Sequence, residues 1–221
     1  MLLNKNNINL LIDFDSTFIR LESLDVISEL SLQNDKNKIL KIMQITNKAM
    51  KGEILFSKAL VQRIAMLDAS KEHLNKAIEL LESNISISFI NNIDFFKNNS
   101  EHIFIISGGF KDIIFPIVKK FNIKYDNIFA NEFLFNNQNI ISGINKNNPL
   151  SKDQGKVSVA KKIYGKNIII GDGYTDYEIK KYNGADFFIQ FIENVNRTSI
   201  NNKADLIANN FDEVITFINE I

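Results

Sequence analysis

Short apolar runs alternate with amphipathic helical segments along this 221-residue sequence, and few folds accommodate that alternation. Four such runs, rich in β-branched and aromatic residues, lie at residues 10–12, 103–106, 167–170 and 187–189. Runs of this kind, each followed by polar or turn-forming residues, are typical of parallel strands buried on both faces. Helical spacing between them, as at 113–121 and 157–164, predicts an α/β fold with a doubly wound parallel sheet.

Residues 17–83 differ from the rest of the chain because they show helical periodicity and no convincing strand. Helices are expected at about 24–30, 39–50, 56–67 and 74–81. Since this block follows the first strand directly, we expect a helical cap domain, 17–83, inserted into a core domain formed by 1–16 and 84–221. The cap would lie over the carboxyl edge of the sheet, where a lid can exclude water from a site. A small β-hairpin is predicted at 129–144.

Charge and composition restrict the partners of the chain. Lysine plus arginine and aspartate plus glutamate both number 26, so no net field attracts nucleic acid or an anionic membrane. The absence of cysteine excludes disulfides and thiolate chemistry and fits a reducing compartment. Neither a signal-peptide pattern in residues 1–9 nor an apolar stretch long enough to span a membrane is present. We expect a cytoplasmic protein with a small-molecule partner, no nucleic acid and no membrane, and the sequence leaves a homodimer open.

The first apolar run is followed by two carboxylates, Asp13 and Asp15, and two hydroxyls, Ser16 and Thr17. In open α/β sheets, ligands bind at the carboxyl ends of the strands. Two acids beside a hard cation such as Mg2+ suit phosphoryl chemistry, in which a carboxylate can act as the nucleophile. The alternative interpretation is a helix N-cap, because Asp, Ser and Thr cap helices routinely.

A second motif, Ser107-Gly108-Gly109, follows the second apolar run and precedes an expected helix. A hydroxyl and two residues without Cβ at a strand-to-helix turn let backbone N–H groups approach an anion, with the helix dipole behind them. The motif predicts a phosphate site. Turns of this composition also occur for steric reasons alone.

A third motif, from Gly171 to Asp176, brings another pair of acids to the same edge of the sheet. Glycine on both sides of Asp172 gives backbone freedom, whereas Asp176 fits either a site or the cap of the next helix. Four acids at one edge would repel one another without a cation, which favours a metal site. Of the lysines that precede this motif, Lys156 is preferred because it follows Gly155 at the start of an expected helix and can point toward the sheet edge.

Together these residues resemble the haloacid dehalogenase superfamily of phosphatases, whose motifs run D-x-D-x-T, then Ser or Thr, then Lys, then G-D-x-x-x-D. They are found here at residues 13–17, Ser107, Lys156 and residues 171–176. Within the superfamily, the sequence is similar to the phosphoserine phosphatase family in the patterns D-x-D-S-T-x-I-R-x-E, I-S-G-G-F, N-x-F-A-N and G-D-G-x-T-D. The similarity covers nearly the whole chain and implies the superfamily's Rossmann-like core with an inserted helical cap.

The resemblance implies roles for the motif residues. Asp13 would be the nucleophile that becomes an aspartyl phosphate, and Asp15 the general acid and then the general base. Mg2+ would be held by Asp13, Asp172 and the backbone carbonyl of Asp15, with Asp176 supporting the site. The transferring phosphoryl oxygens would be bound by Ser107, Gly108, Gly109 and Lys156.

The resemblance also implies that the substrate is O-phospho-L-serine, hydrolysed to L-serine and phosphate. Glu22 would face its ammonium group and Arg63 its carboxylate, because a zwitterion needs one anion and one cation. The other residues implied to line the pocket are Met50, Thr175 and Arg197.

One departure from the family pattern lies in the cap, where the usual Met-Gly-Gly is Met50-Lys51-Gly52. The Lys51 side chain would either crowd the pocket or point to solvent. Two alternatives stay open: a phosphatase of the same superfamily for another small phosphomonoester, such as phosphothreonine or phosphocholine, and a non-catalytic regulatory protein of the same fold.

Overall fold

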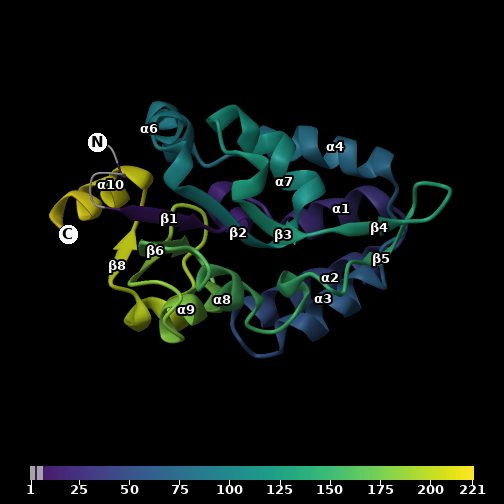
Figure 1. Cartoon of the computed structure of the whole chain (residues 1–221). Helices are drawn as coiled ribbons and strands as arrows, with labels where there is room; N and C mark the ends of the chain where they lie inside the picture. The colour runs from purple at the N-terminus through teal and green to yellow at the C-terminus, as the bar shows by residue number, and fades with distance from the viewer. Residues whose placement is uncertain (1–2, 4–6) are drawn as a thin grey trace.

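The four predicted runs form the central strands of one six-stranded sheet, in a computed structural model that describes residue 3 and residues 7–221 (Figure 1). In spatial order the strands are β3 (Ile128–Asn131), β2 (Ile103–Phe110), β1 (Ile8–Ile12), β6 (Lys166–Gly171), β7 (Phe187–Phe191) and β8 (Leu206–Ala208). Every neighbouring pair in this sheet is parallel. The predicted parallel α/β fold is confirmed. Of the two edge strands, β8 was not predicted, and β3 was assigned to the predicted hairpin instead of this sheet.

The strand order reverses direction beside β1. The chain proceeds outward from β1 through β2 to β3, and later outward from β6 through β7 to β8 on the other side. A reversal of this kind opens a crevice at the carboxyl ends of the two central strands, where ligands bind in such sheets. The first and third motifs follow β1 and β6, so both lie at this crevice.

Both faces of β1 are buried, which explains why its sequence is a continuous apolar run. Leu10 and Ile12 belong to the larger apolar cluster, whereas Leu11 belongs to a second cluster on the other face. None of the three side chains is exposed to solvent. A strand covered on both sides cannot show the alternating pattern of a half-exposed strand.

Helices cover the two faces of the sheet. They are α5 (Ile87–Asn91), α6 (Ile93–Asn98), α7 (Lys111–Val118), α8 (Gly155–Ala160), α9 (Tyr174–Lys181) and α10 (Phe211–Glu220). In Figure 1, α6 and α7 lie above the sheet, and α8 and α9 lie below it. Residues of α7 pack in the cluster of Leu10, and residues of α8 and α9 pack in the cluster of Leu11. The sheet is therefore the middle layer of three.

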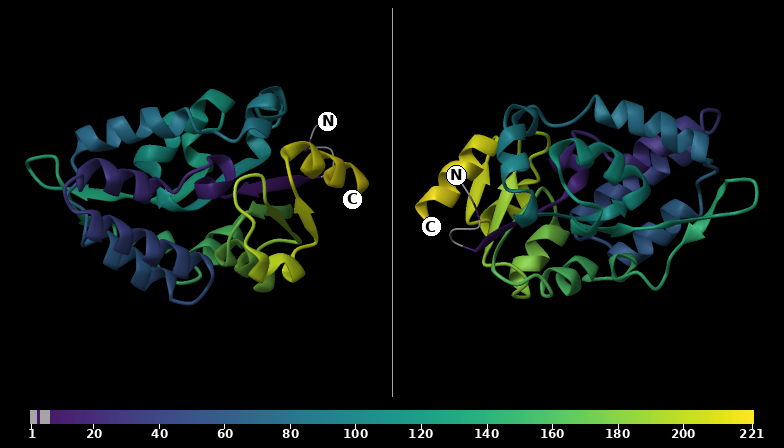
Figure 2. Two further views of the ribbon diagram at one scale, coloured as in Figure 1. Left: turned by 180° about the vertical axis from the view of Figure 1, so that it is seen from behind. Right: turned by 45° about the horizontal axis from the view of Figure 1, so that its top comes forward.

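Four helices, here called the cap helices, lie between β1 and α5 in the chain. They are α1 (Ser23–Ser31), α2 (Lys36–Met50), α3 (Phe56–Ile64) and α4 (Lys71–Glu82). Asp35 caps α2 by accepting from the Lys38 N–H, and Ser70 with His73 forms a capping box on α4. Seen from behind, the cap helices gather at one end of the molecule and α10 lies at the other (Figure 2). The division into a cap at 17–83 and a core at 1–16 and 84–221 stays a prediction.

The predicted hairpin at 129–144 is partly wrong. The hairpin consists of β4 (Phe133–Phe135) and β5 (Ile141–Ile144), whereas residues 129–131 belong to β3 and pair with β2. The hairpin reaches the cap helices, because the Lys71 N–H donates to the Asn139 carbonyl and the Ile141 N–H donates to the Ala69 carbonyl. It therefore contacts the chain just before α4.

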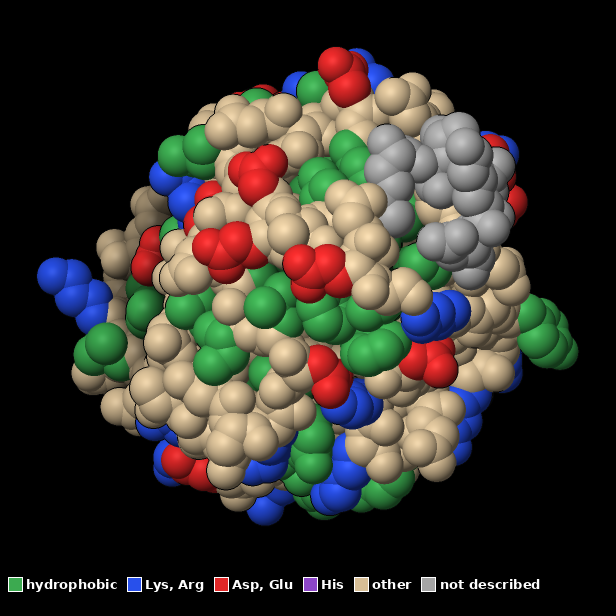
Figure 3. Space-filling view, turned by 90° about the vertical axis from the view of Figure 1, so that its left-hand side faces the viewer, with side chains coloured by type: hydrophobic (Ala, Val, Ile, Leu, Met, Phe, Trp, Pro, Cys, Tyr) green, Lys and Arg blue, Asp and Glu red, His purple; other side chains and the backbone are tan. Residues whose placement is uncertain are grey.

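The surface carries both signs of charge. On the face opposite the cap helices, acidic and basic side chains are scattered among apolar ones (Figure 3), consistent with the equal numbers of acidic and basic residues in the chain. Among the described residues, no helix is both long and apolar enough to cross a membrane. The predicted absence of a signal peptide concerns residues 1–9, of which 1–2 and 4–6 lie outside the described part.

Candidate active site

Three charged side chains from different elements meet where β1 ends. Asp13 follows β1, Lys156 lies in the first turn of α8, and Asp176 lies in the first turn of α9. The Lys156 ammonium lies 2.7 Å from Asp13 Oδ1 and 2.7 Å from Asp176 Oδ1, and all three residues are buried. Burial lowers the pKa of Lys156, but the neighbouring Asp13 and Asp176 carboxylates outweigh it and the pKa is raised. Lys156 therefore points to the sheet edge as a cation.

Asp15 lies in the tight turn that follows β1, and its carboxylate points at the start of α1. Ser23 donates to it twice, from its backbone N–H to Oδ1 at 2.8 Å and from its hydroxyl to Oδ2 at 3.1 Å. Since Ser23 is the first residue of α1, the interpretation of this acid as a helix cap is partly right. Burial, then the charges of Glu22 and Asp13, raise the pKa of Asp15 well above its usual value. That shift favours the protonated form of a general acid.

Ser16 completes the turn with a left-handed backbone at a φ of 57°. This conformation is uncommon outside glycine, and such strained residues gather at functional sites. The Ser16 hydroxyl donates to Glu22 Oε1 at 2.7 Å, which fixes the predicted ammonium-binding carboxylate. Sequence reasoning missed Ser16 and Ser23 as orienting residues, because the motif places Ser16 beside the acids without indicating its partner.

The segment Ser107-Gly108-Gly109 lies inside β2 and not in a separate strand-to-helix turn, because β2 continues to Phe110 and α7 begins at the next residue. The Gly109 N–H donates to Ser107 Oγ at 2.9 Å. Ser107 is buried, and its hydroxyl keeps a proton with which to bind an anion. The side-chain amide of Asn131 donates to the Gly108 carbonyl at 2.9 Å, which fixes the segment from the neighbouring strand β3.

The glycines around Asp172 provide space and not backbone freedom. Neither Gly171 nor Gly173 has a positive φ, since Gly52 and Gly165 are the glycines that do in the described part of the chain. A Cβ on Gly171 would lie 2.3 Å from the Asp176 carboxylate carbon, so a side chain there would displace Asp176. Asp176 also accepts from the Gly173 N–H at 3.0 Å. Both interpretations of Asp176 therefore hold, because it caps α9 and also belongs to the site.

Asp13, Asp172 and Asp176 form a compact acidic cluster in which one oxygen of each lies within 4.8 Å of the others. Burial is the main cause that raises the pKa of Asp172 and of Asp176 to about 7. Asp172 Oδ2 accepts from Arg197 Nε at 2.6 Å, whereas Oδ1 is buried without a partner among the described residues. A buried carboxylate oxygen without a donor, inside an acidic cluster, suits a hard divalent cation. The residues therefore fit Mg2+.

One small cavity lies between the sheet edge and the cap helices. Its lining residues are Asp13, Asp15, Glu22, Leu24, Met50, Phe56, Arg63, Ser107, Gly108, Gly109, Lys156 and Thr175. All of them except Leu24 and Phe56 were predicted site residues. The sequence gives no signal for these two, because each also fits the apolar face of a cap helix.

Arg63 enters the cavity from α3 and is held by a relay of hydrogen bonds inside the cap. Its Nη1 donates to Thr46 Oγ1 at 3.2 Å, and the Thr46 hydroxyl donates to Asp25 Oδ1 at 2.9 Å. Arg63 is only 4% exposed, and its Nε has no hydrogen-bond partner among the described residues. A buried guanidinium with an unpaired donor is suited to bind a carboxylate. Sequence reasoning missed Thr46 and Asp25.

Besides Asp172 and Asp176, which belong to the acidic cluster, Arg197 and Lys51 lie outside the cavity lining. Arg197 was expected in the lining but instead bridges two acids of the site: its Nε donates to Asp172 and its Nη2 lies 3.5 Å from Glu22 Oε1. Lys51 is exposed and does not line the cavity. Of the two alternatives for Lys51, the structure shows the side chain at the surface.

Comparisons with known proteins agree with this geometry. No family model matches the chain. Human phosphoserine phosphatase is 30% identical over 213 residues, which cover 94% of this chain and 92% of the human protein. The chloroplastic phosphoserine phosphatase of Arabidopsis thaliana is 29% identical over 208 residues, which cover 92% of this chain and 69% of the plant protein.

Solved structures give the same result. A phosphoserine phosphohydrolase-like protein from Francisella tularensis subsp. tularensis SCHU S4 superposes with a TM-score of 0.87 at 32% identity, over 95% of this chain and 99% of that one. A phospho-aspartyl intermediate analogue of phosphoserine phosphatase superposes with a TM-score of 0.78 at 23% identity, over 96% and 98% of the two chains, and supports the fold. Because the identity to the human enzyme extends over nearly the full length of both proteins, this chain belongs to the phosphoserine phosphatase family of haloacid dehalogenase-like hydrolases.

Proposed function

We propose that this chain hydrolyses O-phospho-L-serine to L-serine and inorganic phosphate, with Mg2+ as cofactor and residues 17–83 as a lid. The observation that carries the proposal is the composition of a single cavity. It is lined by groups suited to phosphoryl transfer, such as Asp13 and Lys156, and by one anion and one cation, Glu22 and Arg63. These groups match the two ends of the substrate, a phosphate and a zwitterionic amino acid.

Asp13 is the nucleophile in the proposed mechanism. One of its carboxylate oxygens forms a bond to phosphorus while the bond between phosphorus and the serine oxygen breaks. Asp15 donates its proton to the departing oxygen, and its raised pKa favours the form that can do so. The products of this step are L-serine and an aspartyl phosphate on Asp13.

Water then attacks the phosphorus of the aspartyl phosphate. The bond between phosphorus and the Asp13 oxygen breaks, and Asp15, now a carboxylate, accepts the proton of the water. Phosphate leaves and both aspartates return to their starting forms. The two hydrogen bonds from Ser23 keep the Asp15 carboxyl in place for both steps.

The transferring oxygens are bound by the Ser107 hydroxyl, the Lys156 ammonium and the Gly108 N–H in this proposal. The Gly109 N–H acts indirectly, because it already donates to Ser107 Oγ. Fixed donors in a buried site stabilise charge that develops in the transition state.

Mg2+, when bound, would neutralise the charge of the phosphoryl oxygens and of the acidic cluster. Asp13, Asp172 and the Asp15 carbonyl would hold it. Asp176 supports them, since it pairs with Lys156 and accepts from the Gly173 N–H. The unpartnered Oδ1 of Asp172 supports this assignment.

Phosphate release across a panel of substrates tests the proposal. We expect Mg2+-dependent release with a higher kcat/KM for phosphoserine than for phosphothreonine or phosphocholine. A preference for phosphocholine, which lacks the carboxylate that Arg63 would bind, contradicts the proposed substrate. No release from any ester favours a non-catalytic role. The Asp13→Asn variant should show no turnover with an unchanged circular dichroism spectrum, and retained turnover contradicts the proposed nucleophile.

A further inference from the structure

The cap helix α3 has no capping side chain of its own, and an aspartate of the core takes that place. The N-cap residue of α3 is Leu55, whose side chain makes no capping hydrogen bond to the first N–H groups of the helix. Asp153, in the loop that precedes α8, accepts from the Ser57 N–H at 2.9 Å and from the Ser57 hydroxyl at 2.9 Å. Both carboxylate oxygens of Asp153 thus accept hydrogen bonds from one residue of α3, Ser57. An N-cap is normally supplied by the residue just before the helix.

We propose that Asp153 is a positioning residue that holds α3, and with it Phe56 and Arg63, against the core over the site. The inference rests on the proposed function, because it gives Arg63 a role in binding substrate. Phe56 lies at the start of α3 and Arg63 near its end, and both line the cavity. An anchor at Ser57 therefore acts on a helix that carries two residues of the site.

The contact between Phe56 and the core is close and depends on the position of α3. A Cβ on Gly108 would lie 2.6 Å from the Phe56 ring, so the ring rests directly on the predicted phosphate segment. Ser57 is the next residue along the chain. A shift of the helix start at the Asp153 anchor would therefore alter the contact between the Phe56 ring and Gly108.

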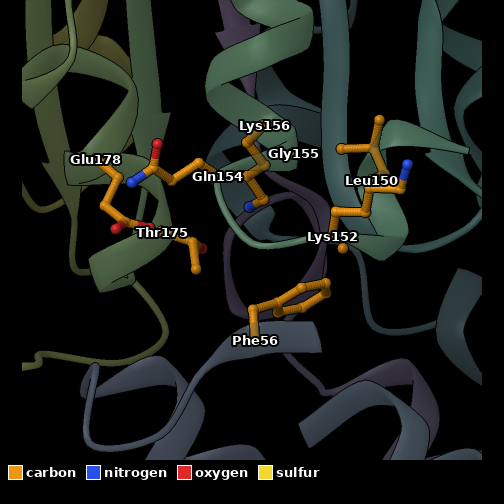
Figure 4. A pocket seen from close by; sticks show the side chains of 9 residues that line it. Phe56, Leu150, Lys152, Gln154, Gly155, Lys156, Thr175 and Glu178 are labelled. Carbon is orange, nitrogen blue, oxygen red and sulfur yellow. The ribbon is translucent and has the colours of Figure 1, made fainter. Parts of the chain in front are cut away.

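Apolar side chains of α3 also pack against the main apolar cluster, in which Leu60 is fully buried. A second, small cavity lies beside the anchor and is lined by Phe56, Lys152, Gln154 and Gly155, among others. Figure 4 shows Phe56 on the cap ribbon, facing Lys156 and Gly155 across this space. The two Asp153 hydrogen bonds therefore add a polar contact at the start of α3 to the apolar contacts that the helix makes.

The segment that joins α2 to α3, residues 51–55, also contacts the core. Gly52, which has a φ of +75°, lies so close to the core that a Cβ there would be 2.9 Å from the Tyr174 ring. That contact fixes the end of α2 and not the start of α3. Asp153 supplies the anchor that acts on α3 itself.

The experiment compares Asp153→Ala with a matched loss of another N-cap. Asp35→Ala is the control, because Asp35 accepts from the Lys38 N–H at 3.0 Å and caps α2 within the cap. For Asp153→Ala we expect kcat/KM for phosphoserine to fall about fivefold, mostly through KM, as the loss of one N-cap of about 1 kcal/mol predicts. Asp153→Asn should retain most of the activity, since Asn is an equally good cap. Asp35→Ala should leave both constants within twofold of the parent.

Hydrogen exchange separates this inference from the proposed function. Asp153→Ala should raise amide exchange in α3, and Asp35→Ala in α2 only. If Asp153→Ala and Asp35→Ala change KM equally, or if α3 exchange is unchanged in Asp153→Ala, the inference is wrong. If the parent protein does not hydrolyse phosphoserine, the proposed function is wrong, while the exchange data still decide whether Asp153 anchors α3.

Discussion

At the scale of single residues, Arg63 is held by partners on two other cap helices. Asp25 of α1 accepts from Thr46 of α2, and Thr46 accepts from Arg63 of α3. An arginine side chain has many rotamers, and fixing one before the substrate binds reduces the entropy cost of binding. Burial lowers the pKa of Arg63, but the carboxylates of Glu22 and Asp25 oppose that shift. The relay therefore both orients the guanidinium and supports its charge.

The Thr46→Val variant should impair binding of the substrate carboxylate. Valine preserves the shape of the side chain but removes the hydroxyl, so that Arg63 and Asp25 lose their common partner. A hydrogen bond to a charged group contributes about 1.5 kcal/mol, so KM for phosphoserine should rise about tenfold. Phosphoethanolamine, which has no carboxylate, should show an unchanged KM, and Thr46→Ser should behave as the parent. An equal rise in KM for both substrates would exclude a role for Thr46 in carboxylate binding.

The sequence indicated the proposed catalytic and metal-binding residues better than it indicated the residues that orient them. Asp13, Lys156 and Asp172 stand in motifs with fixed order, each at the end of a buried strand or the start of a helix. Thr46 and Ser23 are single hydroxyls on helices, and their partners lie many residues away or on another element. Such pairs form only when the elements pack, so no local sequence pattern predicts them.

At the scale of elements, the site depends on how closely α3 approaches β2. Gly108 is a glycine because the Phe56 ring of the cap occupies the position of a side chain there. The sequence suggested that this glycine serves the approach of backbone N–H groups to phosphate. Its packing against the cap is a second and independent reason for a residue without Cβ.

The Gly108→Ala variant should hold α3 away from the core. A methyl group 2.6 Å from the Phe56 ring cannot be accommodated unless the ring or the helix moves. Overpacking of this kind costs about 1–3 kcal/mol, which corresponds to a loss of about 5- to 150-fold in kcat/KM. Gly143→Ala is the matched control, because a Cβ there meets no atom within 4 Å. Kinetics equal to those of the parent in Gly108→Ala would show that Phe56 moves freely. A Phe56→Ala change should restore part of the loss.

The strands differ in how far the sequence predicts them. β1 and β6 were predicted because strands covered on both faces leave continuous apolar runs. β8 spans only Leu206–Ala208 at the edge of the sheet, and so short a strand has no distinct pattern. β3 was assigned to the hairpin because it continues into β4 with one residue between them. Which sheet β3 joins is decided by its pairing with β2, which is not local in sequence.

At the scale of the whole molecule, a chain without net charge concentrates acids at one point. Its acidic and basic residues are equal in number, yet Asp13, Asp172 and Asp176 converge where β1 and β6 end. Lys156 and Arg197 are the cations paired with them in the described structure. The acidic cluster joins both halves of the sheet, so its charge state affects the stability of the entire core.

Mg2+ should therefore stabilise the protein more at pH 8 than at pH 5.5. Burial raises the pKa of Asp172 and Asp176 to about 7, against about 3.9 in an unfolded chain. Between these values the folded state binds more protons than the unfolded state, so the stability of the metal-free protein falls as the pH rises from about 4 to 7. Mg2+ competes with those protons for the carboxylates. Once the protons have dissociated, Mg2+ at a hundredfold excess over its Kd should raise the free energy of unfolding by about 2.7 kcal/mol, or the Tm by roughly 5–10 °C. Thermal unfolding with and without Mg2+ measures the difference. Equal shifts at the two pH values, or an undiminished shift in Asp172→Asn, would place the cation outside this cluster.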